Sequence, residues 1–95
     1  MSILLEIIDR KGKRIRLTEK QWAHITLEHP DVSNVDEIRN VIEKPTAVKQ
    51  SHIDPENAQW FFRYDKQKRK YLFVSVKYLN GDGFIITAHY RRTIP

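Results

Sequence analysis

The fold is decided by the stretch KYLFVSVKYLNGDGFIITAHYR, which runs from Lys70 to Arg91. Two runs rich in β-branched and aromatic residues, 70–79 and 84–91, flank the turn signal Asn80-Gly81-Asp82-Gly83. Apolar and polar residues alternate along both runs, so the stretch predicts two strands joined by a tight turn. A third strand is predicted at 59–65, and together the three form an antiparallel meander.

The sequence before this meander predicts a β-hairpin, two short helices and a short additional strand. Apolar runs at 3–9 and 14–17 flank a four-residue turn that contains a glycine. A capping box at 18–21 begins a helix that ends near His29, because a proline follows it. Ser33 is predicted to cap the second helix. The buried stripe of that helix comprises Val35, Ile38, Val41 and Ile42, and the short strand spans 46–50.

Residues 1–95 are predicted to form a single α+β domain. A chain of 95 residues has the length of one domain, and 40% hydrophobic residues suffice for one core. The composition differs from that of disordered chains, which are poor in apolar residues. A hairpin, then helices, then a meander is an order typical of α+β rather than α/β proteins.

The charge of the chain favours an anionic partner. Lys and Arg number 17 against 12 Asp and Glu, which gives a net charge of +5, although a basic surface also serves solubility alone. The absence of cysteine excludes disulfides and thiolate metal sites. Glu6 and Asp9 interrupt the first apolar run, so we expect neither a signal peptide nor a membrane span, and a cytoplasmic location.

Alternation sorts the side chains of the three strands onto two faces. The more apolar face is expected to pack beneath the helices and carries Trp60, Phe62, Tyr64, Leu72, Val74, Val76, Phe84, Ile86, Ala88 and Tyr90. The matching register sets Val76 opposite Ile86 and Val74 opposite Ala88. The other face mixes rings, cations, hydroxyls and a histidine: Gln59, Phe61, Arg63, Tyr71, Phe73, Ser75, Lys77, Ile85, Thr87, His89 and Arg91.

A face that combines rings with cations suits RNA. Aromatic rings stack on unpaired bases, and Arg and Lys neutralise phosphates. The expected RNA-binding residues are Arg63, Tyr71, Phe73, Arg91 and Arg92. The alternative is that the N-terminal hairpin covers part of this face and buries Phe61 and Phe73.

The histidines are the candidate proton donors and acceptors. His24 and His29 lie about 140° apart around the first helix, so they do not form a helical metal-binding pair. One interpretation makes His29 a partly buried helix end and His24 a surface residue near Glu28. His89 lies on the mixed face beside Thr87 and titrates near neutral pH. RNA cleavage needs a base, an acid and cations, and we expect no metal and no cofactor.

Several short motifs between residues 15 and 91 occur together in this chain. They are Ile15-Arg16-Leu17-Thr18, Trp22-Ala23-His24-Ile25, Glu28-His29-Pro30, Lys44-Pro45, the aromatic strand 60–64, FVSVK at 73–77 and FIITAHY at 84–90. In these motifs the sequence resembles the phage-type Barnase–EndoU–colicin–RelE-like (BECR fold) nuclease domains. The resemblance implies a RelE-like fold of two helices and an antiparallel sheet, with metal-independent ribonuclease activity of toxin type. By position it implies roles for His24, His29, Lys77, Thr87 and Tyr90.

The sequence therefore predicts an endoribonuclease that uses the 2′-hydroxyl as nucleophile and leaves a cyclic phosphate. The expected catalytic residues are His24, His29, Lys77, Thr87 and His89, with either His24 or His89 as base or acid. A catalytic His89 would be particular to this chain, since relatives are expected to carry an aliphatic or aromatic residue there. The alternative is a non-catalytic RNA- or protein-binding module of the same fold. RNA and an acidic antitoxin, or another protein, are the expected partners.

Overall fold

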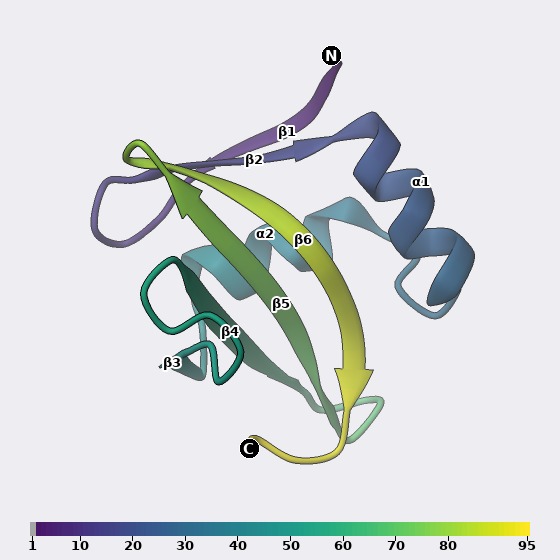
Figure 1. Ribbon diagram of the computed structural model, residues 1–95. Coiled ribbons are helices and arrows are strands. Elements are labelled where there is room, and N and C mark those ends of the chain that lie inside the picture. The colour runs from purple at the N-terminus through teal and green to yellow at the C-terminus, as the bar shows by residue number, and fades with distance from the viewer. Residues whose placement is uncertain (1) are drawn as a thin grey trace.

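The computed structural model describes residues 2–95 and contains one six-stranded sheet with two helices. The elements are β1 (Ile3–Ile8), β2 (Arg14–Thr18), α1 (Glu19–Glu28), α2 (Val35–Glu43), β3 (Ala47–Gln50), β4 (Ala58–Asp65), β5 (Lys70–Leu79) and β6 (Asp82–Arg91). The strand order is β1-β2-β6-β5-β4-β3 (Figure 1). The α+β class is confirmed, as is the order of hairpin, helices and meander.

The sheet is mixed, whereas the sequence predicted an antiparallel one. Strands β2 and β6 run parallel and pair through Ile15 with Gly83 and Arg16 with Phe84. All other neighbouring strands run antiparallel. The hairpin β1–β2 thus extends the sheet beyond β6, which local periodicity cannot reveal because the pairing joins segments almost 70 residues apart.

Both helices begin at a side chain that accepts a backbone hydrogen bond. Thr18 Oγ1 accepts from the Gln21 amide at 3.1 Å, as the capping box predicted. The second helix is capped by Asn34, whose Oδ1 accepts from the Asp36 amide at 2.9 Å. The prediction of Ser33 was wrong by one residue, because serine and asparagine cap helices about equally well.

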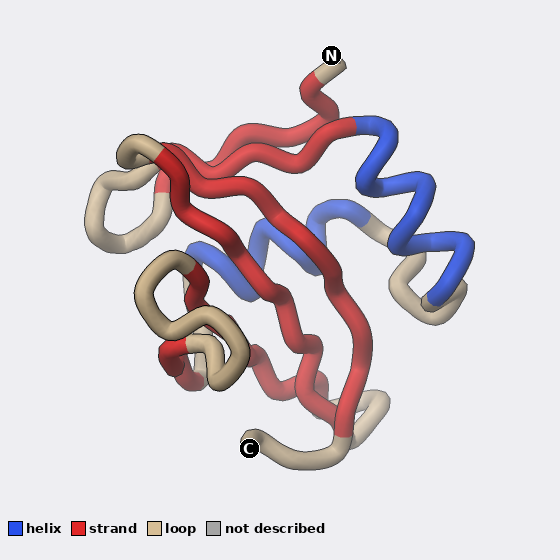
Figure 2. Tube along the Cα trace, in the orientation of Figure 1, coloured by secondary structure: helices blue, strands red, loops and turns tan. Residues whose placement is uncertain are grey.

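The helices occupy different places on the sheet. Helix α2 lies behind the sheet, whereas α1 lies beside the edge of β6 (Figure 2). The stripe of Ile38, Val41 and Ile42 on α2 is fully buried, but only Ile25 of α1 is. The core between α2 and the sheet also contains Leu5, Ile7, Ile15, Leu17, Val32, Phe61, Leu72, Val74, Val76, Ile85 and Ala88.

The predicted faces of β4 were wrong. Asp65 pairs with Lys70 across a four-residue turn, and this register sets Phe61 opposite Val74. Phe61 therefore belongs to the helix side with Gln59 and Arg63, while Trp60, Phe62 and Tyr64 lie on the opposite side. Rings occupy both faces of β4, so its periodicity carries no information about which face is buried.

A β-bulge corrects the predicted register of β5 and β6. Val74 pairs with Ala88 as predicted, but the register shifts between Ser75 and Val76, so Val76 pairs with Ile85 rather than Ile86. Ile85 consequently enters the core, and Ile86 becomes 43% exposed. The same shift places Phe84, predicted to be in the core, opposite Lys77.

We call the side of β4, β5 and β6 that faces away from α2 the open face. The pairings and the bulge give it Trp60, Phe62, Tyr64, Tyr71, Phe73, Ser75, Lys77, Phe84, Ile86, Thr87, His89 and Arg91. The alternative in which the hairpin covers one face and buries Phe61 and Phe73 is right about their burial and wrong about its cause, because the two residues lie on opposite faces. Phe73 is 5% exposed and packs against the rings of Trp60, Phe62 and His89. Within residues 2–95 no helix is long and apolar enough to cross a membrane.

Candidate functional site

A groove of about 510 Å³ lies on the open face. Strands β5 and β6 supply one part of its lining: Phe73, Ser75, Lys77, Ile86, Thr87, His89 and Arg91. The remainder comes from the start of β4 and from the loop between β3 and β4: Ser51, Ile53, Asp54, Ala58 and Trp60. This loop, drawn in blue-green, stands forward of β4 in Figure 1. The groove therefore has polar groups at both ends and rings between them.

Two histidines meet at the β6 end of the groove. His29 is the C-cap of α1, and its ring centroid lies 5.1 Å from that of His89. His89 also packs against Phe73, with 4.9 Å between the centroids. The Gln21 side chain donates a hydrogen bond to the Ile86 carbonyl, which ties α1 to the edge of β6. Gln21 lies in the first turn of α1, and the contact of His29 with His89 joins the other end of the helix to the same strand.

The surroundings of His89 favour its neutral form. Partial burial lowers the pKa of His89 below the ordinary value of 6.5, and the positive charges of His29 and Arg91 lower it further. Asp31, in the loop after α1, opposes these effects. A neutral imidazole at neutral pH is able to accept a proton.

Cations lie at both ends of the groove. The guanidinium of Arg91 lies 6.0 Å from the Phe73 ring centroid, and its Nε is buried without a hydrogen-bond partner among the described residues. At the other end, Lys77 Nζ lies 3.6 Å from Asp54 Oδ2. Phe73 pairs with His89, and Lys77 lies four residues further along β5, a distance of about 13 Å at the strand rise. Thr87, opposite Ser75, lies between the two ends.

The predicted catalytic residues fall into two groups. Lys77, Thr87 and His89 line the groove, and His29 touches His89. His24 is exposed on α1, and its Nε2 lies 2.9 Å from Glu28 Oε1. The interpretation of His24 as a surface residue and His29 as a half-buried helix end is therefore confirmed.

The predicted RNA-binding residues are also divided. Phe73 and Arg91 line the groove, whereas Arg63 lies on the helix side and donates from Nη1 to the Lys44 carbonyl at 2.7 Å. Tyr71 lies on the open face against Tyr64, with 5.1 Å between the ring centroids. Arg92 is exposed just beyond β6.

Sequence reasoning missed the groove residues outside β5 and β6. Trp60 was predicted to lie in the core. No role was predicted for Ile53, although it is an isolated apolar residue in the polar loop 51–57. Ile53 is 89% exposed, and Trp60 packs against His52 with 4.7 Å between the ring centroids. An apolar residue in a polar loop, with no place in the predicted core, was the signal in the sequence that could have indicated a binding surface there.

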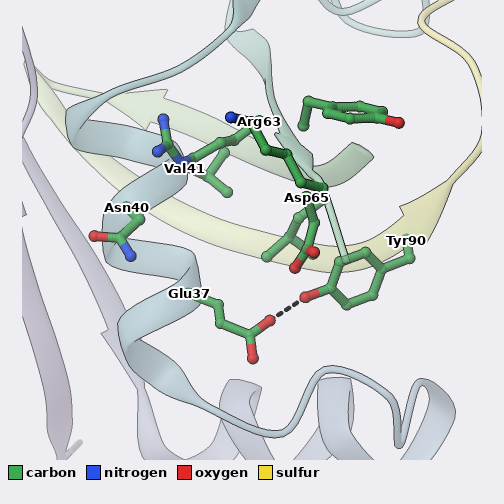
Figure 3. Close-up of a pocket in the computed structure, with 9 residues that line it drawn as sticks. Glu37, Asn40, Val41, Arg63, Asp65 and Tyr90 are labelled. Carbon is green, nitrogen blue, oxygen red and sulfur yellow. Dashed lines mark hydrogen bonds between the residues drawn. The ribbon is translucent and has the colours of Figure 1, made fainter. Parts of the chain in front are cut away.

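A second pocket, of about 300 Å³, lies on the helix side. Tyr90 donates a hydrogen bond from its hydroxyl to Glu37 in α2, and Asn40, Arg63 and Asp65 surround the pair (Figure 3). Burial and the Glu37 carboxylate raise the pKa of Tyr90, so its hydroxyl stays protonated. Tyr90 is thus on the face opposite the groove, away from the other residues that the family resemblance singles out.

Comparison with known proteins leaves the family open. No protein-family model matches the chain. No curated protein matches it either, nor does any solved structure. The likeness to BECR nucleases is a resemblance in sequence motifs alone. Among residues 2–95 no three His, Asp or Glu side chains gather in a way that could hold a metal ion.

Proposed function

We propose that this chain is a metal-independent endoribonuclease of toxin type with a BECR-like arrangement, acting on RNA bound across the open face. The observation that carries the proposal is the contact between His29 and His89, whose ring centroids are 5.1 Å apart. This contact lies at the end of a groove that also contains Arg91 and Thr87. Two histidines are able to supply the base and the acid that phosphodiester cleavage requires. The cation beside them is able to stabilise the charge that develops on the phosphate.

In this mechanism His89 is the base, because its neutral form is favoured at neutral pH. It takes the proton of the 2′-hydroxyl as O2′ forms a bond to phosphorus. The bond from phosphorus to O5′ breaks, and His29 in its protonated form gives a proton to O5′. The products are a 2′,3′-cyclic phosphate and a free 5′-hydroxyl.

Arg91 and Thr87 bind the reacting phosphate in this proposal. A guanidinium donates to two phosphate oxygens at once, and that of Arg91 lies at the groove, 6.0 Å from the Phe73 ring centroid. Lys77 is about 13 Å along the sheet from His89, too far to share the same phosphate. It therefore acts on another part of the RNA.

Single-stranded RNA fits the groove better than a duplex. Trp60 is partly exposed and presents its ring to the groove, and bases stack on such rings only when they are unpaired. The net charge of +5 favours association with a polyanion. Both features agree with a substrate that lies extended along the groove.

The test is incubation of the purified protein with a single-stranded RNA of mixed sequence in EDTA. We expect fragments that end in a 2′,3′-cyclic phosphate, identified by mass spectrometry, and no cleavage of the DNA of the same sequence. His89→Ala is expected to lower the rate by about 10²–10⁴-fold. His24→Ala is the matched control, because His24 is an exposed histidine outside the groove lining, and it is expected to keep the activity.

Two results would contradict the proposal. One is intact RNA in the presence of protein that is folded by circular dichroism, and the other is full activity of His89→Ala. If RNA is bound and left intact, the chain is a binding module of the kind that the sequence offered as the alternative.

A further inference from the structure

We propose that the end of the groove formed by Asp54, Lys77 and Trp60 is a guanine-binding subsite. The inference rests on the proposed function, since it assumes that single-stranded RNA lies on the open face. It adds a base preference and a residue that sets it, Asp54. Three features support it: a slot for a planar ring, a carboxylate held in one place, and a donor and acceptor pattern that matches one base.

The slot is bounded by two exposed aliphatic side chains and by one partly exposed ring. Ile53 is 89% exposed at the tip of the β3–β4 loop, and Ile86 is exposed by the bulge in β6. Trp60 lines the groove with both of them. Its ring is held edge-on by Phe73 at 5.5 Å and flanked by His52 at 4.7 Å between centroids. A flat aromatic ligand in the groove is able to cover both aliphatic side chains and the exposed part of the Trp60 ring.

The β3–β4 loop holds Asp54 in a fixed position. Ser51 is buried, and its Oγ accepts hydrogen bonds from the amides of Ile53 at 3.1 Å and Asp54 at 3.0 Å. The Asp54 carbonyl accepts from the amides of Asn57 and Ala58, and the Asn57 side chain donates to Asp54 Oδ1 at 3.2 Å. The carboxylate is therefore ordered before any ligand arrives, which lowers the entropic cost of binding.

The pair of Asp54 and Lys77 offers an acceptor beside a donor. Their 3.6 Å separation is longer than a hydrogen bond, and both side chains are partly exposed. The carboxylate therefore still has lone pairs to accept with, and the ammonium still has protons to donate. A carboxylate also repels phosphates, so its place in a groove for RNA suits the edge of a base rather than the backbone.

Guanine matches this pattern. Its Watson–Crick edge carries two adjacent N–H donors, at N1 and N2, beside the O6 acceptor. Adenine and cytosine each present a ring nitrogen acceptor next to their amino group, and uracil presents one donor between two acceptors. Only guanine is able to give two parallel hydrogen bonds to Asp54 while O6 accepts from Lys77. Other bases would leave one of these groups without a partner.

The test measures binding of RNA that resists cleavage. Four 2′-O-methyl heptamers of uridine, with G, A, C or U at the central position, are titrated against the protein by fluorescence anisotropy. We expect the guanine oligomer to bind at least about 10-fold more tightly than the other three. Asp54→Asn is expected to reduce this preference to less than about 2-fold, while the affinity for the uridine oligomer stays the same or rises.

Matched variants separate recognition from charge and from folding. Glu56→Gln removes a negative charge from the same loop outside the groove lining, and it is expected to keep the preference. Trp60→Leu is expected to weaken all four oligomers by about 5- to 100-fold. Equal binding of the four oligomers by the unmodified protein, or an unchanged guanine preference in Asp54→Asn, would overturn the subsite.

The binding test of the subsite and the cleavage test of the nuclease can fail independently. A guanine preference without any cleavage of ordinary RNA supports the subsite and rejects the nuclease. Cleavage without a base preference rejects the subsite and leaves the nuclease intact. Failure of all four oligomers to bind overturns the subsite, and the nuclease is overturned with it only if ordinary RNA also stays intact.

Discussion

His89 illustrates how a single side chain acquires its chemistry from neighbours far away in the sequence. Its ring lies between His29, which follows α1, and Phe73 on β5, with Arg91 next to it on the open face of β6. Partial burial and two positive neighbours disfavour the imidazolium, so its pKa falls. A histidine on an exposed strand without these contacts would be half protonated close to pH 6.5.

The pH dependence of cleavage follows from this environment. His89 must be neutral to act as the base, so the acid limb of kcat/KM is expected below pH 6.5. Asp31 raises the pKa of His89, so Asp31→Asn is expected to lower that pKa further and to move the acid limb to lower pH. NMR titration of the His89 ring proton measures the shift directly. Asp36→Asn, in the first turn of α2, is the control and should leave the titration unchanged; an upward shift in Asp31→Asn would contradict the assignment.

At the scale of elements, the junction of β2 and β6 is the feature that the meander does not explain. Ile15 pairs with Gly83 at the start of β6, and the pairing ends after Phe84. Beyond that point α1 lies along the edge of β6, tied to the Ile86 carbonyl. The junction and this hydrogen bond together hold α1 against β6 and, with it, His29 beside His89.

Gly83 is required at this junction by space rather than by backbone conformation. A Cβ atom there would lie 2.9 Å from Ile15 Cγ1, closer than real Cβ atoms come to a neighbour, and 3.0 Å from Val76 Cγ1, which is tighter than nine in ten real contacts. Gly83→Ala is therefore expected to lower the free energy of unfolding by about 1–3 kcal/mol, as overpacked sites do. Urea denaturation measures the change. Leu27→Ala on the exposed side of α1 is the control, expected within about 0.5 kcal/mol of the unmodified protein. Equal stability of the two variants would show that the junction relaxes freely.

For the whole molecule, the sheet separates two apolar clusters and two sets of cations. The core lies between the sheet and α2, and a smaller ring cluster of Phe62, Phe73 and Trp60 lies on the open face. Arg91 belongs to the open face, whereas Arg63 belongs to the helix side. The net charge alone does not distinguish these arginines, but the salt dependence of RNA binding does.

Each phosphate contact to single-stranded RNA adds about −0.7 to the slope of log affinity against log salt concentration. Arg91→Gln is therefore expected to reduce the magnitude of that slope by about 0.7. Arg63→Gln removes the same charge from the helix side and is expected to leave the slope unchanged. Anisotropy titrations at several salt concentrations measure both slopes. A larger change of slope in Arg63→Gln than in Arg91→Gln would place the RNA on the helix side and contradict binding to the open face.

Local signals predicted the elements and their order well. The helix cap at Thr18, the Asn80-Gly81 turn and the helical stripe of α2 each act within a few residues, and each is confirmed. Lys77, Thr87 and His89 were correctly grouped on one face because they belong to neighbouring strands of a strong hairpin, although the grouping of Phe61 and Arg63 with them failed. Their role in catalysis stays a prediction.

What the amino-acid sequence determined by itself is the set of helices, strands and turns, because capping, turn geometry and periodicity depend on near neighbours. Only the tertiary structure decided the face of β4, the bulge that exposes Ile86, the parallel pairing of β2 with β6 and the approach of His29 to His89. These features arise from the competition of distant segments for the same buried volume, and a shift of one residue between two strands exchanges one face for the other.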